Sequence, residues 1–345
     1  MIETPHEQSG QLPEPHAERR RALISAHPEL RTLAGPAPIT GFAILFLVCA
    51  QTVVAVSMAD QSWWVIFFVA YTIGATANLG CWALIHEASH NLVAKSSVGN
   101  QWWSFVANLP ILVPAAAHFR FWHRHHHKRQ GDIGWDVDLP MPVEVRLVGN
   151  SPVRKAIWLA LFMPLQVVRA HRAAVMPQGD KWIWTNIGTT LFYAGCLLWI
   201  AGPWALAYLL LSSWSAMGLH PFGARWVQEH FTIEECQETT SYYGRLNPLL
   251  FNCGYHNEHH DLPGVPWFYL PTVRRTAPEL YGNLYATRSW TALLWRFLMD
   301  REFTLARRVT RHVSRRATVG NGPAGGFPQT GPCRSRSDSA SAWKG

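Results

Sequence analysis

Charged residues are scarce in this chain of 345 residues, at 15% of the total, against about a quarter in ordinary soluble domains. The six cysteines are scattered and form no CxxC pair, which argues against a disulfide scaffold and a zinc ribbon. Residues 1–21 lack the apolar core of a secretory signal. The sequence is instead 48% hydrophobic and holds 18 tryptophans, so we expect a chain that lives in or on a membrane.

Three long stretches, 32–59, 61–85 and 182–219, contain no Asp, Glu, Lys or Arg. The apolar part of the first begins at Ile39 and is long enough to cross a hydrocarbon core of about 30 Å. Only Asp60 separates the first two stretches, which indicates a hairpin with a minimal turn. The third has "AGP" at 201–203, and Gly and Pro mark a turn there. The sequence therefore predicts four transmembrane helices arranged as two hairpins.

Basic residues are absent from both short turns and lie in the N-terminal segment, in the loop 86–181 and after residue 220. The positive-inside rule then places these segments and both termini in the cytoplasm, at a bacterial inner membrane or the endoplasmic reticulum. This accounts for the net charge of +8 without a nucleic-acid partner. Two shorter uncharged segments, 96–117 and 156–168, are expected to be re-entrant or interfacial.

The same patterns predict the organisation of the chain. We expect a cytosolic N-terminal segment over 1–38 and a membrane domain over 39–313. The tail 314–345 is rich in Gly, Pro, Ser and Arg, which is typical of disorder. The expected fold class is an all-α integral membrane protein whose cytosolic helical cap holds a histidine-rich site.

Histidines cluster in three boxes on that cytoplasmic side: "HEASH" at 86–90, "HRHHH" at 123–127 and "HNEHH" at 256–260. Their spacings of three and four residues place side chains on one face of a helix, so each box could aim its imidazoles at one point. The expected metal ligands are His86, His90, His123, His126, His127, His256, His259 and His260. His125 would face away, and His118 lies outside the pattern.

A single box of this kind is often chance or a basic patch, but three boxes on one side of the membrane favour a metal site. Lone histidines are expected to be solvated surface groups: His6, His16, His27, His171 and His312. Eight imidazoles exceed the four ligands of a structural zinc and are enough for two metal ions. Imidazole suits iron among other metals, and a dinuclear iron centre that activates O2 is the most natural function. Four acids could orient the ligands: Glu87, Asp136, Asp138 and Glu258.

The boxes resemble those of the membrane fatty acid desaturase and hydroxylase superfamily. Within it, the chain resembles the sphingolipid delta-4 desaturase (dihydroceramide desaturase) family. The resemblance covers residues 13–310 and includes, in the family's order, "PHAERRRALISAHPELRTLAGP", "ALIHEASHN", "VANLP", "DVDLP", "GLHP", "SYYGRLN" and "FNCGYHNEHHDLPGVP".

The resemblance implies an O2-dependent oxidoreductase that introduces a double bond, trans and at delta-4, into the sphingoid chain of dihydroceramide or a related long acyl lipid. It implies two iron ions held by the eight box histidines and electrons from a cytochrome b5-like or ferredoxin-like donor. A further ligand is expected after the fourth span, with His230 the best candidate and His220 the second. The basic side chains of Arg124, Lys128 and Arg129 could dock the donor or bind anionic headgroups.

The chain departs from the family pattern at three positions. Arg129 and Gln130 stand where Tyr and Leu are usual, and Arg225 stands where a histidine is expected. Two other enzymes fit the same boxes, a lipid C4-hydroxylase and a general fatty acid desaturase. A non-catalytic membrane metal-binding protein is the remaining alternative, although transport would predict polar residues within the spans.

Overall fold

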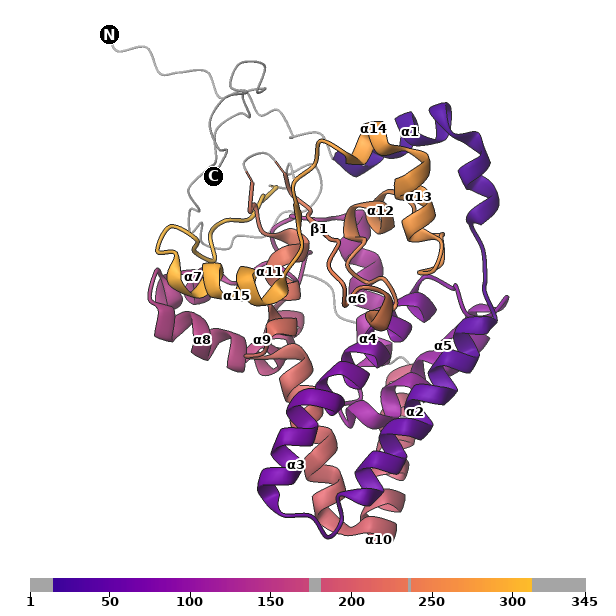
Figure 1. Cartoon of the computed structure of the whole chain (residues 1–345), viewed down its shortest axis with the longest axis vertical. Helices are drawn as coiled ribbons and strands as arrows, with labels where there is room; N and C mark the ends of the chain where they lie inside the picture. The colour runs from indigo at the N-terminus through magenta and orange to yellow at the C-terminus, as the bar shows by residue number, and fades with distance from the viewer. Residues whose placement is uncertain (1–14, 174–180, 235–236, 312–345) are drawn as a thin grey trace, which may run out of the picture.

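The computed structural model describes residues 15–173, 181–234 and 237–311, and these are almost entirely helical (Figure 1). The described strands, β1 (Ser241–Tyr242) and β2 (Ala286–Thr287), form one short parallel pair in which Ser241 lies opposite Ala286. The all-α class expected from the sequence is therefore confirmed. The tail expected to be disordered, 314–345, lies outside the described residues.

Three long apolar helices form the lower part of the molecule in Figure 1, which we call the stem. They are α2 (Ile39–Ser57), the continuous helix built from α3 (Trp63–Val69), the π-helical η2 (Ala70–Gly74) and α4 (Ala75–Ser89), and α10 (Lys181–Met217). Each is long and apolar enough to cross a membrane. Large apolar side chains such as Phe46 and Trp199 are 71% and 87% exposed, as expected for a surface that faces lipid.

The helix α10 contains the break expected at residues 201–203. Gly202 has φ 72° and ψ −174°, a conformation essentially restricted to glycine. Tyr193 bonds to Thr52 and Tyr208 donates to Gln51, both at 2.7 Å. A straight helix would separate two residues 15 positions apart (208 − 193) by about 22 Å, yet their partners on α2 are neighbours. The two halves of α10 therefore lie against the same part of α2.

The segments 96–117 and 156–168 hold only short helices. The first contains α5 (Ser97–Asn108), η3 (Leu109–Ile111) and the start of α6 (Ala116–Lys128), and the second lies within α8 (Pro152–Ala160) and α9 (Phe162–Arg172). At 1.5 Å per residue, a helix of 13 residues extends about 20 Å, which is too short to span a bilayer. None of them belongs to the helices that could cross a membrane.

Apart from α5 and η3, the remaining helices lie above the stem and form what we call the cap (Figure 1). Besides α6, α8 and α9, it contains α1 (Pro15–Ala26), η1 (Pro28–Leu33), α7 (Pro142–Val148), η4 (Pro221–Gly223), α11 (Ala224–His230), η5 (Pro248–Leu250), α12 (His256–Asp261), α13 (Leu270–Thr276), α14 (Pro278–Tyr281) and α15 (Trp290–Met299). Leu23 and Leu30 of the N-terminal segment pack with Leu270, Val273 and Tyr281. The N-terminal segment is therefore part of the cap.

One apolar cluster joins the stem to the cap. Leu79 and Ile85 of α4 belong to one buried cluster with residues of the cap. These are Trp158 of α8, Phe231 directly after α11, and Phe297 of α15. Because side chains in a closely packed interior have little room to shift, this cluster holds the upper end of α4 at a fixed place under the cap. The first histidine box lies at that end.

Candidate metal centre

Helices carry each histidine box to one region between stem and cap. His86 lies in the last turn of α4, and His90 is the residue that ends it. The second box lies in α6, whose last turn is rich in histidine, and the third forms most of α12. His230 is the last residue of α11. Four elements that are distant in sequence therefore bring their histidines together.

The first histidine group contains His86, His90, His123, His127 and His259. One ring nitrogen from each lies within 4.8 Å of the others. The Nε2 atom of His123 lies 2.8 Å from that of His90 and 3.0 Å from that of His127. His259 Nε2 lies 3.0 Å from His127 Nε2. These five imidazoles therefore point into one small space.

The second histidine group contains His126, His230, His256 and His260. Ring nitrogens of His126, His230 and His260 also lie within 4.8 Å of one another. His230 Nε2 lies 2.9 Å from His126 Nε2 and 3.0 Å from His256 Nε2. The two groups adjoin, since the ring of His260 stacks on that of His127 with centroids 4.2 Å apart.

The structure corrects one expectation about the boxes, because each of the two HxxHH boxes is divided between the groups. In α6, His123 and His127 join the first group and His126 joins the second. Successive residues of a helix point about 100° apart, so neighbouring histidines of one box reach different sites. The third box divides in the same way, with His259 apart from His256 and His260.

The structure also places the remaining histidines of the sequence prediction. His230 lies in the second group, whereas His220 packs against Tyr71 and accepts a hydrogen bond from the Phe222 amide. His220 belongs to neither group within the described residues. His125 faces its own helix, with Nδ1 2.9 Å from the carbonyl of Phe121, as expected for a bystander.

The arrangement fits metal ions. Two imidazoles bound at about 2.1 Å and about 90° to each other on one ion have nitrogens about 3 Å apart, which matches the Nε2 separations of 2.8 to 3.0 Å. In the described residues, the buried Nε2 of His260 has no hydrogen-bond partner. A cation would satisfy that nitrogen and the lone pairs that face one another in both groups.

Burial keeps most of these imidazoles neutral, which is the form that binds metal. Burial first, and then the neighbouring histidines, lower the pKa of His123, His127 and His259 well below the ordinary value. His126 differs, since burial disfavours its charged form but the charge of Asp136 outweighs this and raises its pKa. Burial alone would raise the pKa of Asp136, but the charge of His126 and its hydrogen bond outweigh this and lower that pKa.

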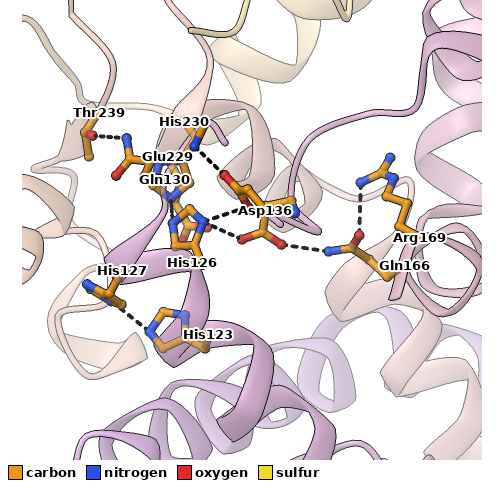
Figure 2. Close-up of polar contacts among 12 residues, drawn as sticks. His123, His126, His127, Gln130, Asp136, Gln166, Arg169, Glu229, His230 and Thr239 are labelled. Atoms are coloured by element: carbon orange, nitrogen blue, oxygen red, sulfur yellow. Dashed lines mark hydrogen bonds and ion pairs between the residues drawn. The ribbon is translucent and has the colours of Figure 1, made fainter. Parts of the chain in front are cut away.

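Carboxylates support the second group. His126 Nδ1 lies 2.9 Å from Asp136 Oδ1 and 3.4 Å from Asp138 Oδ2 (Figure 2). Asp136 also accepts from the backbone amides of Gly131 and Asp138, so it orients the imidazole and caps the loop at once. Asp136 therefore lies where it could orient a metal-bound imidazole, as expected from the sequence.

The acids inside the boxes behave differently. Glu258 accepts from the hydroxyls of Ser241 and Tyr243 at 2.8 and 2.6 Å, so the expectation that it orients an imidazole is wrong. Its carboxylate instead links α12 to Ser241 of β1 and to Tyr243, which follows β1. Glu87 accepts from the Trp267 amide, and its other oxygen lies 3.9 Å from His86 Nδ1, beyond hydrogen-bond distance.

The largest network that the sequence did not predict connects the N-terminal helix α1 to α12. His16, expected at the surface, is buried, with Nδ1 2.7 Å from Asp261 Oδ1 and Nε2 2.7 Å from Thr239. Arg19 donates to Asp261 as well, at 2.5 Å. His16 and Arg19 share one face of α1, but their partner Asp261 is distant in the chain, so no local spacing reveals it.

One of the departures from the family pattern joins this network. Gln130 is buried and its Nε2 lies 3.4 Å from the Thr239 hydroxyl that also contacts His16 (Figure 2). The polar side chain at this position therefore links the loop after α6 to the N-terminal helix, which a leucine there could not do.

A cavity of about 640 Å³ runs beside both histidine groups. His86, His123 and His259 of the first group line it, as do His126, His230 and His256 of the second. Most of the remaining wall is apolar and comes from α4, α6, α9 and α10. The volume is typical of a site for one organic ligand, and the lining suits an alkyl chain held beside the histidines.

Known protein families that match this chain support the interpretation of the site. The family model "Fatty acid desaturase" matches residues 62–292, and "Sphingolipid Delta4-desaturase (DES)" matches residues 11–39. A sphingolipid delta(4)-desaturase of Oryza sativa subsp. japonica is 37% identical over 287 residues, 83% of this chain and 87% of its own length. A Drosophila melanogaster sphingolipid delta(4)-desaturase is 36% identical, and the matched region covers 83% and 89% of the two chains. A human sphingolipid delta(4)-desaturase/C4-monooxygenase is also 36% identical, with the same coverage.

The chain belongs to the fatty acid desaturase family, which together with its apolar helices makes it a membrane oxidoreductase. Within that family it belongs to the sphingolipid delta(4)-desaturases, by its N-terminal segment and by its relatives. The family implies an iron-dependent enzyme that uses O2. The resemblance stated from the sequence is thereby confirmed, and the non-catalytic alternative is not supported.

Proposed function

We propose that this protein is a di-iron desaturase that uses O2 to introduce a trans delta-4 double bond into the sphingoid chain of dihydroceramide-like sphingolipids. The observation that carries the proposal is the meeting of two histidine groups along one apolar cavity. The names of the relatives supply the substrate class and the position of the double bond.

Nine histidines would hold the two irons. The first group, which would hold one ion, is His86, His90, His123, His127 and His259. The second group, which would hold the other, is His126, His230, His256 and His260. Each group offers at least four nitrogens, and imidazole is a good ligand for iron. His230 rather than His220 is the additional ligand in this proposal.

Bound iron supplies the activation of O2 and the oxidising power needed to break two C–H bonds. The balance requires four electrons for the reduction of O2 to two waters. Two come from the adjacent C–H bonds of the substrate, and two come from a cytochrome b5-like or ferredoxin-like donor. The apolar wall holds the alkyl chain so that one C–C bond stays beside the histidines, and it excludes water from the site.

Asp136 keeps the second group in its binding form. By accepting a hydrogen bond from His126 Nδ1–H, it fixes the tautomer whose Nε2 lone pair faces His230. Asp138 accepts from Gln166, which holds the loop against α9. These side chains position the imidazole and do not contact the substrate.

The basic face of α6 is the proposed surface for the electron donor. Arg124 and Lys128 are exposed on the helix that carries three of the ligands. An acidic carrier would be attracted to this face, and the same helix leads directly to both groups.

The proposed topology has four crossings as two hairpins, with the two halves of α10 as separate spans. The break at Gly202 and the apposition of both halves to α2 support it. The cap, the histidine groups and the termini then lie on the cytoplasmic side, where the positive-inside rule places the basic segments. The membrane domain would run over 39–313, with the described part of the N-terminal segment 1–38, residues 15–38, docked on it.

A second candidate is hydroxylation at carbon 4. It is favoured by the name of the human relative, which combines a delta(4)-desaturase with a C4-monooxygenase. Both outcomes begin by removing a hydrogen from the same region of the chain. A general acyl lipid is the alternative substrate on this scaffold.

The test is expression in a host fed dihydroceramide and fatty acids, with wild type beside His260→Ala and lipid products identified by mass spectrometry. We expect a delta-4 double bond from wild type only. A chain that gains oxygen and no double bond would show hydroxylation to be the main reaction, and equal product from both proteins would refute the histidine assignment.

A further inference from the structure

A buried arginine lies in the wall of the apolar cavity. Arg225 lines it together with His86, His230 and His256, so it lies beside both histidine groups. Its side chain is only 13% exposed. Nη1 donates to Glu229 one turn later on α11, and the guanidinium lies over the ring of Trp226, 4.3 Å from the centroid.

Several donors in this wall have no acceptor. Within the described residues, Arg225 Nε is buried and has no hydrogen-bond partner. The same holds for the indole nitrogens of Trp82, Trp122 and Trp226, which also line the cavity. All four groups can only donate. The side chains that carry these donors line the cavity, and a plain hydrocarbon chain has no acceptor to offer them, whereas a ligand that carries oxygen does.

Two other polar side chains of the wall already have hydrogen-bond partners. Gln166 donates to Asp138 and accepts from Arg169 (Figure 2), and Ser213 donates to the carbonyl of Ile111. Arg225 is different because it is charged and retains an unpaired donor, and hydrogen bonds from a charged donor are the stronger kind. It is therefore the group in this wall best suited to recognise an oxygen atom.

The chemistry of a delta-4 desaturation places such an oxygen nearby. A sphingoid chain carries a hydroxyl on carbon 3, one bond away from carbon 4. If carbons 4 and 5 lie beside the histidines, this hydroxyl lies one bond further along the chain, in the cavity that Arg225 lines together with those histidines. A fatty acyl chain desaturated far from its carboxyl would bring only methylene groups to the same place.

We propose that Arg225 is a specificity-determining residue that donates a hydrogen bond to the carbon-3 hydroxyl of the sphingoid chain and so selects lipids with an oxygen next to the reactive carbons. The inference rests on the proposed function for the identity of the reactive carbons. It concerns a position where the family pattern led us to expect histidine.

The experiment compares an N-acyl sphinganine with its 3-deoxy analogue. Dissociation constants are measured on the iron-loaded protein without reductant, and kcat/KM is then measured with an electron donor present. We expect wild type to prefer the hydroxylated lipid by about 10- to 100-fold. Arg225→Gln should remove most of that preference by weakening binding of the hydroxylated lipid while leaving the 3-deoxy lipid within about threefold. Arg225→Lys keeps the charge but not the geometry and should fall between them.

Two results would overturn the inference: wild type that binds both lipids equally, or Arg225→Gln that weakens both by the same factor. The first needs no variant, so it decides the matter even if Arg225→Gln fails to fold. Arg288→Gln, at an exposed arginine of the cap, is the control and should change neither constant. Iron content and melting temperature are measured for each variant. If selective binding is found but no double bond forms, the proposed reaction fails and the inference about Arg225 stands.

Discussion

The two histidine groups differ in what surrounds them. The first is built largely from α4 and α6 and has no carboxylate within hydrogen-bond distance of its imidazoles in the described residues, since Glu87 lies 3.9 Å from His86. The second is backed by Asp136, at 2.9 Å from His126, and Asp138. Anionic partners make a bound imidazole a stronger ligand. The two proposed iron positions should therefore differ in affinity.

The N-terminal helix adds to that difference. Asp261 follows His260 of the second group directly and is fixed by His16, Arg19 and Tyr281. The ring of His16 lies 4.8 Å from that of His260, measured between centroids. The second group is therefore held from outside by His16, which lies 245 residues before Asp261 in the chain, whereas the first relies on the packing of the stem.

The largest effect should come from removing one ligand of either group. His127→Ala and His126→Ala each delete one imidazole from a different group, and we expect each to lower the turnover rate by at least about a thousandfold, because groups that act as a unit fail together. His125→Ala on the same helix, which faces away, should retain full activity. An active His126→Ala enzyme would mean that one group suffices.

Replacing the carboxylates near each histidine group tests whether the two groups differ in iron affinity. Asp136→Asn should weaken iron binding by about 10- to 100-fold, the usual cost of losing a carboxylate that orients a ligand. Glu87→Gln should change it by less than about threefold, since Glu87 contacts a backbone amide rather than an imidazole. Titration with a chelator measures both, and equal losses would show that the groups do not differ in this way.

A smaller effect, on stability, should follow from Asp261→Asn. It leaves Arg19 and His16 without their charged partner in a buried place and should cost about 3 kcal/mol. Glu279→Gln, in the exposed pair with His27, is the control and should leave the melting temperature unchanged. Thermal unfolding in detergent decides it; an unaltered melting temperature for Asp261→Asn would show that this network does not hold the N-terminal helix.

The smallest effect should come from the stem. Gly202→Ala places a side chain where φ is 72° and ψ −174°, and should destabilise the protein by about 1 to 3 kcal/mol. Gly195→Ala in the same helix meets nothing within 4 Å and should be neutral or slightly stabilising. The difference between the two melting temperatures measures the strain; no difference would argue against a turn at Gly202.

Much of this site follows from local spacing in the sequence. The three- and four-residue intervals predict which histidines share a helix, and "AGP" predicts the break in α10. The division of each HxxHH box between two groups could not be predicted, because it depends on how α6, α11 and α12 approach one another. The burial of His16 could not be predicted either, since its partner Asp261 is distant in the chain and a lone histidine carries no periodic signal.

The most direct test of the account is the metal content of the purified protein. We predict about two irons per chain for wild type, about one for His259→Ala from the first group and about one for His260→Ala from the second. His125→Ala should keep both. A wild-type chain that holds about one zinc and no iron would contradict the central claim, as would a His260→Ala chain that still binds two irons.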